Sequence, residues 1–589
     1  MGKTYYLGLS MAGTVSAGTY TAGCLIELDN WLKAWRNAVN ANQPVKLIAQ
    51  LDYGPYKKHD IITLDAAEIP KHEVKITTLT GSSGGGVSAT LYAIGLATGQ
   101  VEHFLRDTWM GFDIDDMLNI GDIQGNAPKA ASILNVLPIE KVINQLKALT
   151  WGANNLLNVD YITDHIELYQ TLSNYEAIPY NLVYYQNQIH MPGTFHNHFD
   201  YVRYSLAKTP GPLPDSGTPY RYDLEINPGT KLANDLKWQV MLQSTPATGA
   251  FPIGFRPREV DRLRAEYDGK MFYLKYSIPG SEVDYDKVNP NWIKGPNTSL
   301  KMKYFDGGTF DDEPHDLARA SILRYLNNVC GMNLSQLPNK GNDTYASVIL
   351  INPFPTHRDA TEPGTAVPEI PNLFQQPPLL IGALMDQGRF HPDWIEKLTN
   401  EQYYSRFLIS PSRPNACGDN NYMLAGATFG AFGGFLDQKY REHDYELGHY
   451  NTYKFLFENF AVPENNVVVD YYHNAGQPTK DKYRALGWVT DDIMKDKNGK
   501  DETVTHVQII PCFVKHEGIN YKVPDWPVMG NTRWQSIRQS VLTRSKMMIK
   551  NLTGIGSLLE DLGWLIIGKE KVNEMLDAME KVLKEANLL

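Results

Sequence analysis

The expected fold is decided by the segment Thr77-Thr78-Leu79-Thr80-Gly81-Ser82-Ser83-Gly84-Gly85-Gly86-Val87-Ser88-Ala89. The alternating residues that lead into it are typical of a buried strand, and the small, apolar run 87–98 predicts a helix packed on a sheet. Between them, residues 81–85 match the G-x-S-x-G nucleophile elbow, in which a serine occupies a strained strand-to-helix turn. Ser83 is therefore a candidate nucleophile. Taken alone, the pattern is equally compatible with a plain glycine-rich turn.

Two further stretches accompany this segment. The first is a predicted strand at residues 5–9, which runs into the small-residue loop 10–23 and then a helix. The second is Asp306-Gly307-Gly308, directly after a short aromatic stretch. An Asp-Gly pair is common in ordinary turns, so Asp306 gains interest only from the other two stretches.

In this order, the three blocks resemble those of the patatin-like phospholipases, and in particular their longer bacterial forms. Segments 18–25, 247–252, 432–435 and 441–448 are also similar to blocks of that family. The resemblance implies an oxyanion loop with backbone donors at Gly13 and Thr14, and a Ser83–Asp306 dyad without a histidine. The motif glycines that it marks are Gly18, Gly81, Gly84, Gly85, Gly307 and Gly308.

The activity that this resemblance implies is hydrolysis of lipid acyl esters, of the phospholipase A type, through an acyl-enzyme on Ser83. No metal or cofactor is expected. An aspartate with an ordinary pKa of about 3.9 is a weak base, but burial beside Ser83 would raise the pKa of Asp306 and make proton transfer feasible.

The chain departs from the family pattern in two ways. The family places an arginine or lysine in the oxyanion loop, where this chain has Ala17, and only the first of its three consecutive glycines remains, as Gly13. The separation of Ser83 and Asp306 is also long. We expect the surplus, within 110–175 or 255–300, to form a lid or pocket wall, or a structural elaboration without a gating role.

The domain organisation expected from the sequence has two parts. An α/β domain with a mainly parallel central sheet and helices on both faces, of patatin-like three-layer type, should span 1–412 and carry a helical insertion at about 110–175. A mainly helical extension should span 413–589. Its segment 531–550 is locally basic and could attract anionic lipid headgroups, although a solvated face of a core helix explains it as well.

Composition limits the function classes. The chain has 589 residues and a net charge of −11, which argues against a broad nucleic-acid surface. Its four cysteines are scattered without a C-x-x-C pair, as suits a reducing compartment. We expect a cytoplasmic protein that could contact membranes peripherally. The sequence does not indicate an oligomeric state.

Three alternatives stay open at this point. The first is an α/β-hydrolase esterase in which His506 or His516 completes a Ser-His-Asp triad. The second is a nucleotide-binding loop at residues 13–18, which lacks the lysine that a P-loop needs next. The third is a non-catalytic lipid-binding protein that keeps the fold.

Overall fold

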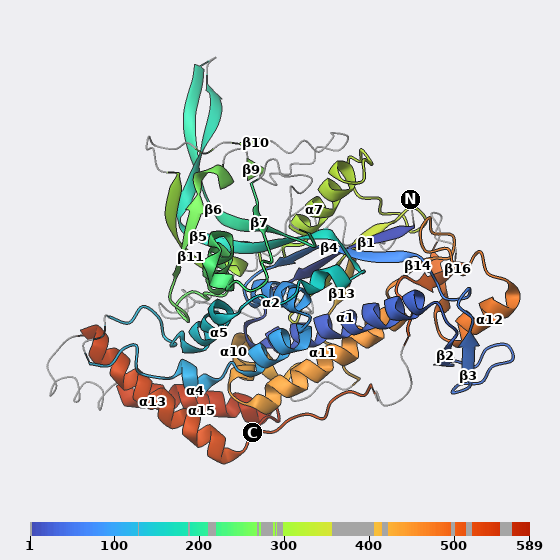
Figure 1. Ribbon diagram of the computed structural model, residues 1–589. Coiled ribbons are helices and arrows are strands. Elements are labelled where there is room, and N and C mark those ends of the chain that lie inside the picture. The colour runs from blue at the N-terminus through green and yellow to red at the C-terminus, as the bar shows by residue number, and fades with distance from the viewer. Residues whose placement is uncertain are drawn as a thin grey trace.

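The computed structural model describes residues 3–589 with gaps at 126, 128, 187–188, 210–219, 268–269, 272–286, 289, 291–297, 356–405, 415–421, 496–500, 514–520 and 554–567. Figure 1 shows a central sheet with helices packed around it and a long hairpin that extends from one end. Among the described residues, no helix is both long enough and apolar enough to span a membrane.

Within the described ranges, the central sheet has nine strands and is mainly parallel, so the predicted α/β class is confirmed. Its main path runs β13-β12-β1-β4-β5-β11-β8, and β6 and β7 continue from β5. The first five strands of that path pair in parallel, whereas β11 is antiparallel to both β5 and β8. The strands are β1 (Thr4–Met11), β4 (Glu73–Gly81), β5 (Ile162–Gln186), β6 (Ile189–Ala207), β7 (Tyr222–Leu224), β8 (Arg258–Leu263), β11 (Ser299–Asp306), β12 (Ala346–Ile351) and β13 (Arg406–Ile409).

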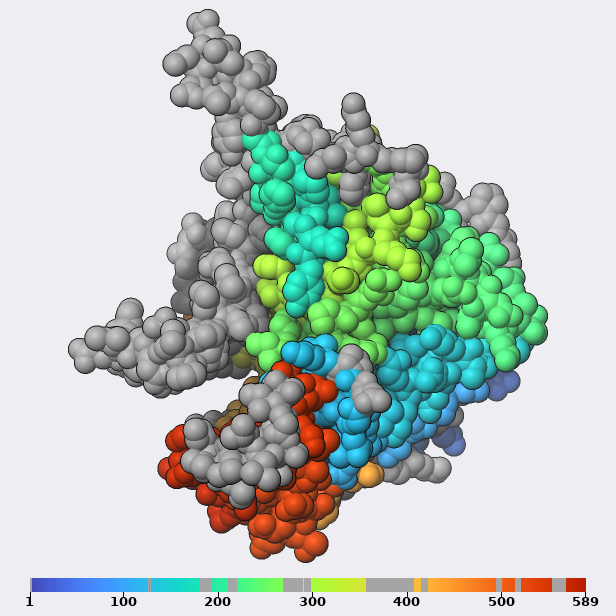
Figure 2. All heavy atoms as spheres, turned by 90° about the vertical axis from the view of Figure 1, so that its left-hand side faces the viewer, coloured from blue at the N-terminus to red at the C-terminus, as the bar shows by residue number. Residues whose placement is uncertain are grey.

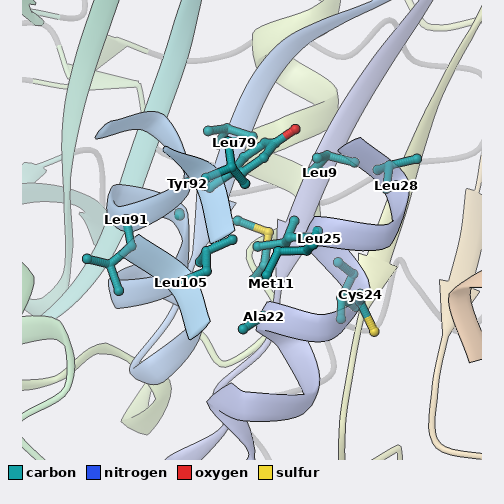
Figure 3. Packing of buried hydrophobic residues seen from close by; sticks show 14 of the residues in the cluster. Leu9, Met11, Ala22, Cys24, Leu25, Leu28, Leu79, Leu91, Tyr92 and Leu105 are labelled. Carbon is teal, nitrogen blue, oxygen red and sulfur yellow. The ribbon is translucent and has the colours of Figure 1, made fainter. Parts of the chain in front are cut away.

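Helices cover both faces of this sheet. On one face lie α1 (Gly18–Ala41), α2 (Gly84–Thr98) and α6 (Leu236–Thr248). Figure 3 shows Leu9 and Met11 of β1 against side chains of α1, with Leu79 of β4 and Tyr92 of α2 beside them. The opposite face is covered by α7 (His315–Asn328), whose apolar side chains pack on β12 in a separate cluster. The alternation of strand residues sends one set of side chains to each layer.

The insertion predicted at 110–175 is helical only in part. It contains α4 (Ile114–Met117) and α5 (Leu137–Ala148), but β5 begins at Ile162, so the prediction is wrong for residues 162–175. The residues that follow are rich in tyrosine and β-branched side chains, and they pair with β6 over almost the whole length of the hairpin. This hairpin projects beyond the sheet in Figure 1.

The C-terminal part packs closely on the sheet domain. Helix α11 (Gln438–Glu458) runs along α1, and the two backbones meet at a glycine on each helix: a Cβ on Gly23 would lie 2.2 Å from the Tyr445 carbonyl oxygen, and one on Gly448 would lie 2.3 Å from that of Tyr20. One hydrophobic cluster includes buried residues from both parts. Besides its helices, this part contains a small antiparallel sheet of β14 (Ala461–Pro463), β16 (Asp501–Gln508) and β15 (Val489–Lys495).

The basic helix near the C-terminus is α13 (Asn531–Thr553), which packs with α15 (Lys569–Glu585). Its arginines are engaged inside the molecule. Arg533 pairs with Asp113 and Asp115, and the buried Arg544 pairs with Asp122. Figure 2 shows the red α13–α15 pair directly against the blue segment that carries these aspartates. Asp113, Asp115 and Asp122 therefore hold α13 in place.

The remaining elements are short. They are β2 (Val45–Ile48), β3 (Ile61–Leu64), β9 (Lys270–Met271), β10 (Lys287–Val288), α3 (Thr108–Met110), α10 (Thr428–Ala431) and α12 (Gln477–Ala485).

Candidate active site

Ser83 occupies a strained turn between β4 and α2. Its φ of 51° and ψ of −129° lie where residues with a side chain are rare, and it stands directly before the first residue of α2. Gly81 and Gly85, which flank Ser83, leave no room for a side chain. A Cβ on Gly81 would lie 2.4 Å from the Gly85 carbonyl oxygen, and a Cβ on Gly85 would lie 2.3 Å from that of Met11. The local geometry is that of a nucleophile elbow.

Asp306 lies at the end of β11, and its carboxylate contacts Ser83. The Ser83 hydroxyl donates to Asp306 Oδ2 at 2.5 Å, and the Gly308 N–H donates to Asp306 Oδ1 at 2.8 Å. The tight turn that follows also depends on a glycine, because a Cβ on Gly307 would lie 2.2 Å from the Thr171 carbonyl oxygen. The structure thus brings together the two residues that the sequence selected from distant segments.

Burial changes the acid–base properties of Asp306. Its side chain is almost completely enclosed, and this desolvation raises its pKa from 3.8 to about 7. The hydrogen bonds from Ser83 and Gly308 oppose the rise, whereas the nearby Asp312 adds to it. A carboxylate with a pKa near the working pH is a far better general base than an ordinary aspartate.

The oxyanion loop differs from expectation at Gly13. The Gly13 N–H donates to the Asp312 carbonyl oxygen at 3.2 Å, so in this arrangement it is not a free donor. Among the described residues, the N–H groups of Thr14 and Gly84 have no acceptor within the protein. These two residues are adjacent, since a Cβ on Gly84 would lie 2.1 Å from Thr14 Oγ1. The N–H groups of Thr14 and of Gly84, the residue after Ser83, are therefore the ones available to bind an oxyanion.

An apolar pocket opens beside Ser83, and its space together with the open mouth is about 630 Å³. Part of its wall comes from the predicted insertion, as anticipated for the surplus between the two site residues, and one residue comes from the C-terminal part. The lining residues are Val15, Ser83, Gly84, Val87, Trp109, Phe112, Met117, Ile139, Val142, Ile143, Thr245, Pro246, Gly249, Phe251, Phe255 and Phe435.

The C-terminal part also holds the oxyanion loop, through contacts that the sequence reasoning missed. The Ser16 hydroxyl donates to the Ala431 carbonyl oxygen and accepts the Gly434 N–H. Arg441 in turn donates to the carbonyl oxygens of Gly434 and Phe435. The available signal was the block 432–435 with 441–448, which resembled the family without a role attached to it.

Of the two histidines proposed for a triad, His506 does not join this site. His506 lies in β16 of the small C-terminal sheet, where its Nδ1 is 2.7 Å from Asp492 Oδ2. Neither Ser83 nor Asp306 has a histidine among its hydrogen-bond partners in the described part of the chain. His516 lies outside the described residues.

Comparison with known proteins adds a distant relative. No family model matches the chain. The uncharacterized protein y4iI of Sinorhizobium fredii (strain NBRC 101917 / NGR234) is 25% identical over 522 residues, which cover 80% of this chain and 67% of that protein. Because that relative is itself uncharacterized, the function must be argued from the geometry of the site.

Proposed function

We propose that the protein is a serine acyl-ester hydrolase of the patatin-like phospholipase type. The observation that carries the proposal is the 2.5 Å hydrogen bond from the Ser83 hydroxyl to the buried Asp306 carboxylate, at the wall of an apolar pocket. A serine on a strained turn at a helix N-terminus, bonded to a base whose pKa is about 7, has the arrangement that nucleophilic catalysis requires.

The proposed reaction needs only these two side chains and backbone donors. Asp306 accepts the Ser83 proton while Ser83 Oγ attacks the ester carbonyl, and the N–H groups of Thr14 and Gly84 stabilise the oxyanion. When the tetrahedral intermediate collapses, the protonated Asp306 gives its proton to the leaving alcohol. Water then attacks the acyl-enzyme with Asp306 again as base, which releases the carboxylic acid and restores Ser83.

The pocket supports a lipid substrate. Only Ser83 and Thr245 among its lining residues carry a hydroxyl group, and the other lining residues are glycines or apolar side chains. Such a wall favours an acyl chain over a polar acyl group, because each polar group placed against it loses its hydrogen bonds to water. The order of the three sequence blocks supports the same family.

The test is labelling with a fluorophosphonate probe followed by hydrolysis assays. Wild type should be labelled, Ser83→Ala should not, and Ser82→Ala provides the matched control because that serine lies in the same turn. Labelling that survives Ser83→Ala would reject Ser83 as the nucleophile. A panel of phospholipids, lysolipids and neutral glycerides then identifies the substrate. Lipid binding without labelling or hydrolysis would instead support the non-catalytic alternative.

A further inference from the structure

The interior of the pocket offers hardly any polar side chain to a ligand apart from Ser83. The Thr245 hydroxyl donates to the Met241 carbonyl oxygen at 2.7 Å and accepts from the Gln170 side chain at 2.9 Å. The Trp109 indole N–H donates to the Ser88 hydroxyl at 3.0 Å. Both polar groups that could face a ligand are therefore already bonded within the protein. A ligand that fills this pocket gains only by burying apolar surface.

The volume limits how much chain can enter. A methylene group takes up roughly the share of volume of one water molecule, about 30 Å³. A space of about 630 Å³, which includes its open mouth, thus has room for no more than about 20 methylene groups. This upper limit excludes the two chains of a typical diacyl lipid and leaves room for at most one long acyl chain.

Helix α5 provides a regular wall for such a chain. Ile139, Val142 and Ile143 line the pocket and follow the i, i+3, i+4 spacing that places side chains on one face of a helix. Ile143 is 5% exposed, and its neighbour one turn along, Leu146, is 2% exposed but does not line the pocket. Ile143 can therefore be mutated to test the pocket, and Leu146, which is similarly buried on the same helix, can serve as the control.

We propose that the pocket binds one linear acyl chain, that of the ester bond to be cleaved, and that Ile143 helps to set the preferred chain length. The headgroup and any second chain remain outside. This inference deepens the proposed hydrolase function and rests on it.

The experiment measures kcat/KM for monomeric p-nitrophenyl esters with acyl chains from four to sixteen carbons. While the pocket fills, each added methylene should raise kcat/KM by up to about fourfold, which corresponds to about 0.8 kcal/mol per buried methylene. The increase in kcat/KM should stop at a definite acyl-chain length. Ile143→Trp should end it at a shorter chain, and Ile143→Ala should lower the gain per methylene. Leu146→Ala, which removes a comparable buried side chain, should keep the wild-type profile.

The outcomes separate this inference from the proposed function. Wild-type enzyme that is labelled on Ser83 but shows the same kcat/KM for all chain lengths would overturn the acyl pocket and leave the hydrolase intact. If Ser83 is not labelled, the proposed hydrolase function is rejected, and the binding of fatty acids then tests whether the pocket holds an acyl chain. Thermal shifts of Ser83→Ala with fatty acids of eight to sixteen carbons should then still depend on chain length and on Ile143. Absence of that dependence, or the same change in Leu146→Ala, would reject the inference.

Discussion

Replacing Asp306 with asparagine tests the role of the base most directly. The substitution nearly preserves the shape of the side chain but removes its ability to accept the Ser83 proton. General-base catalysis contributes about 10²–10⁴-fold to a rate, so we expect kcat to fall by that factor in a variant that remains folded. In wild type, only the ionised form of Asp306 is active. Activity should therefore rise with pH and level off above about 7, the pKa to which burial raises this carboxyl.

The same pKa predicts an unusual gain in stability. An aspartate with a pKa of 3.8 when unfolded and about 7 when folded binds more protons in the folded state, so folding stability declines between these pH values. A difference of about three pKa units, at 1.36 kcal/mol per unit, corresponds to about 4 kcal/mol. Asparagine does not ionise and avoids this loss. Relative to wild type, Asp306→Asn should therefore gain about 3 kcal/mol between pH 5 and pH 8.

The assay combines hydrolysis of a soluble ester with denaturant unfolding of both proteins at pH 5 and pH 8. Wild type should lose stability between these two values, and the variant should lose much less. Equal differences in unfolding free energy at both pH values would show that Asp306 is not a buried acid of raised pKa. Retained activity in Asp306→Asn would reject it as the base.

Three further substitutions address the surroundings of the dyad. Gly13→Ala would place a Cβ 2.1 Å from Asp312 Oδ1, so labelling of Ser83 should be lost or slowed at least tenfold, as measured by probe kinetics. Ser16→Ala leaves the buried N–H of Gly434 without its acceptor, so the free energy of unfolding should fall by about 2 kcal/mol. In this variant kcat should fall by a larger factor than KM changes. Ser16→Thr keeps the hydroxyl group and should recover both properties. His506→Ala should keep turnover within a few-fold, and a severe loss in folded protein would favour a histidine base.

The elements that position the dyad were predictable because their signals are local. The strand–turn–helix around Ser83 and the turn at Asp306 follow from alternation, small apolar residues and glycine positions within short windows. The start of the β5–β6 hairpin was not predicted because its strand structure depends on pairing with β6, and residues 162–175 do not reveal that partner by themselves.

The pocket and the contacts that hold the predicted oxyanion loop could not be predicted from the sequence, because both bring together residues that are far apart in the chain. Phe435 and Val15 line the same space, and Ser16 bonds to Ala431 and Gly434 more than 400 positions away. The ion pairs of Asp115 and Asp122 could not be predicted for the same reason, since their partners Arg533 and Arg544 belong to α13. A periodic pattern reports which face of an element is buried but not what covers it.

The same contacts surround Ala17, the position at which the pattern of the patatin-like phospholipases has a basic residue. Ala17 is completely buried in the short helix η1 (Val15–Ala17). This helix contacts η7 (Ala425–Ala427) and η8 (Gly433–Phe435) of the C-terminal part, as well as α11. An arginine or lysine there would need a buried partner for its charge, and without one the desolvation cost would be several kcal/mol. A small residue at position 17 is therefore needed where the C-terminal part packs directly on this loop. Since Ser16 connects the two through its hydroxyl, the loop that should bind the oxyanion is held in place by residues of the C-terminal part.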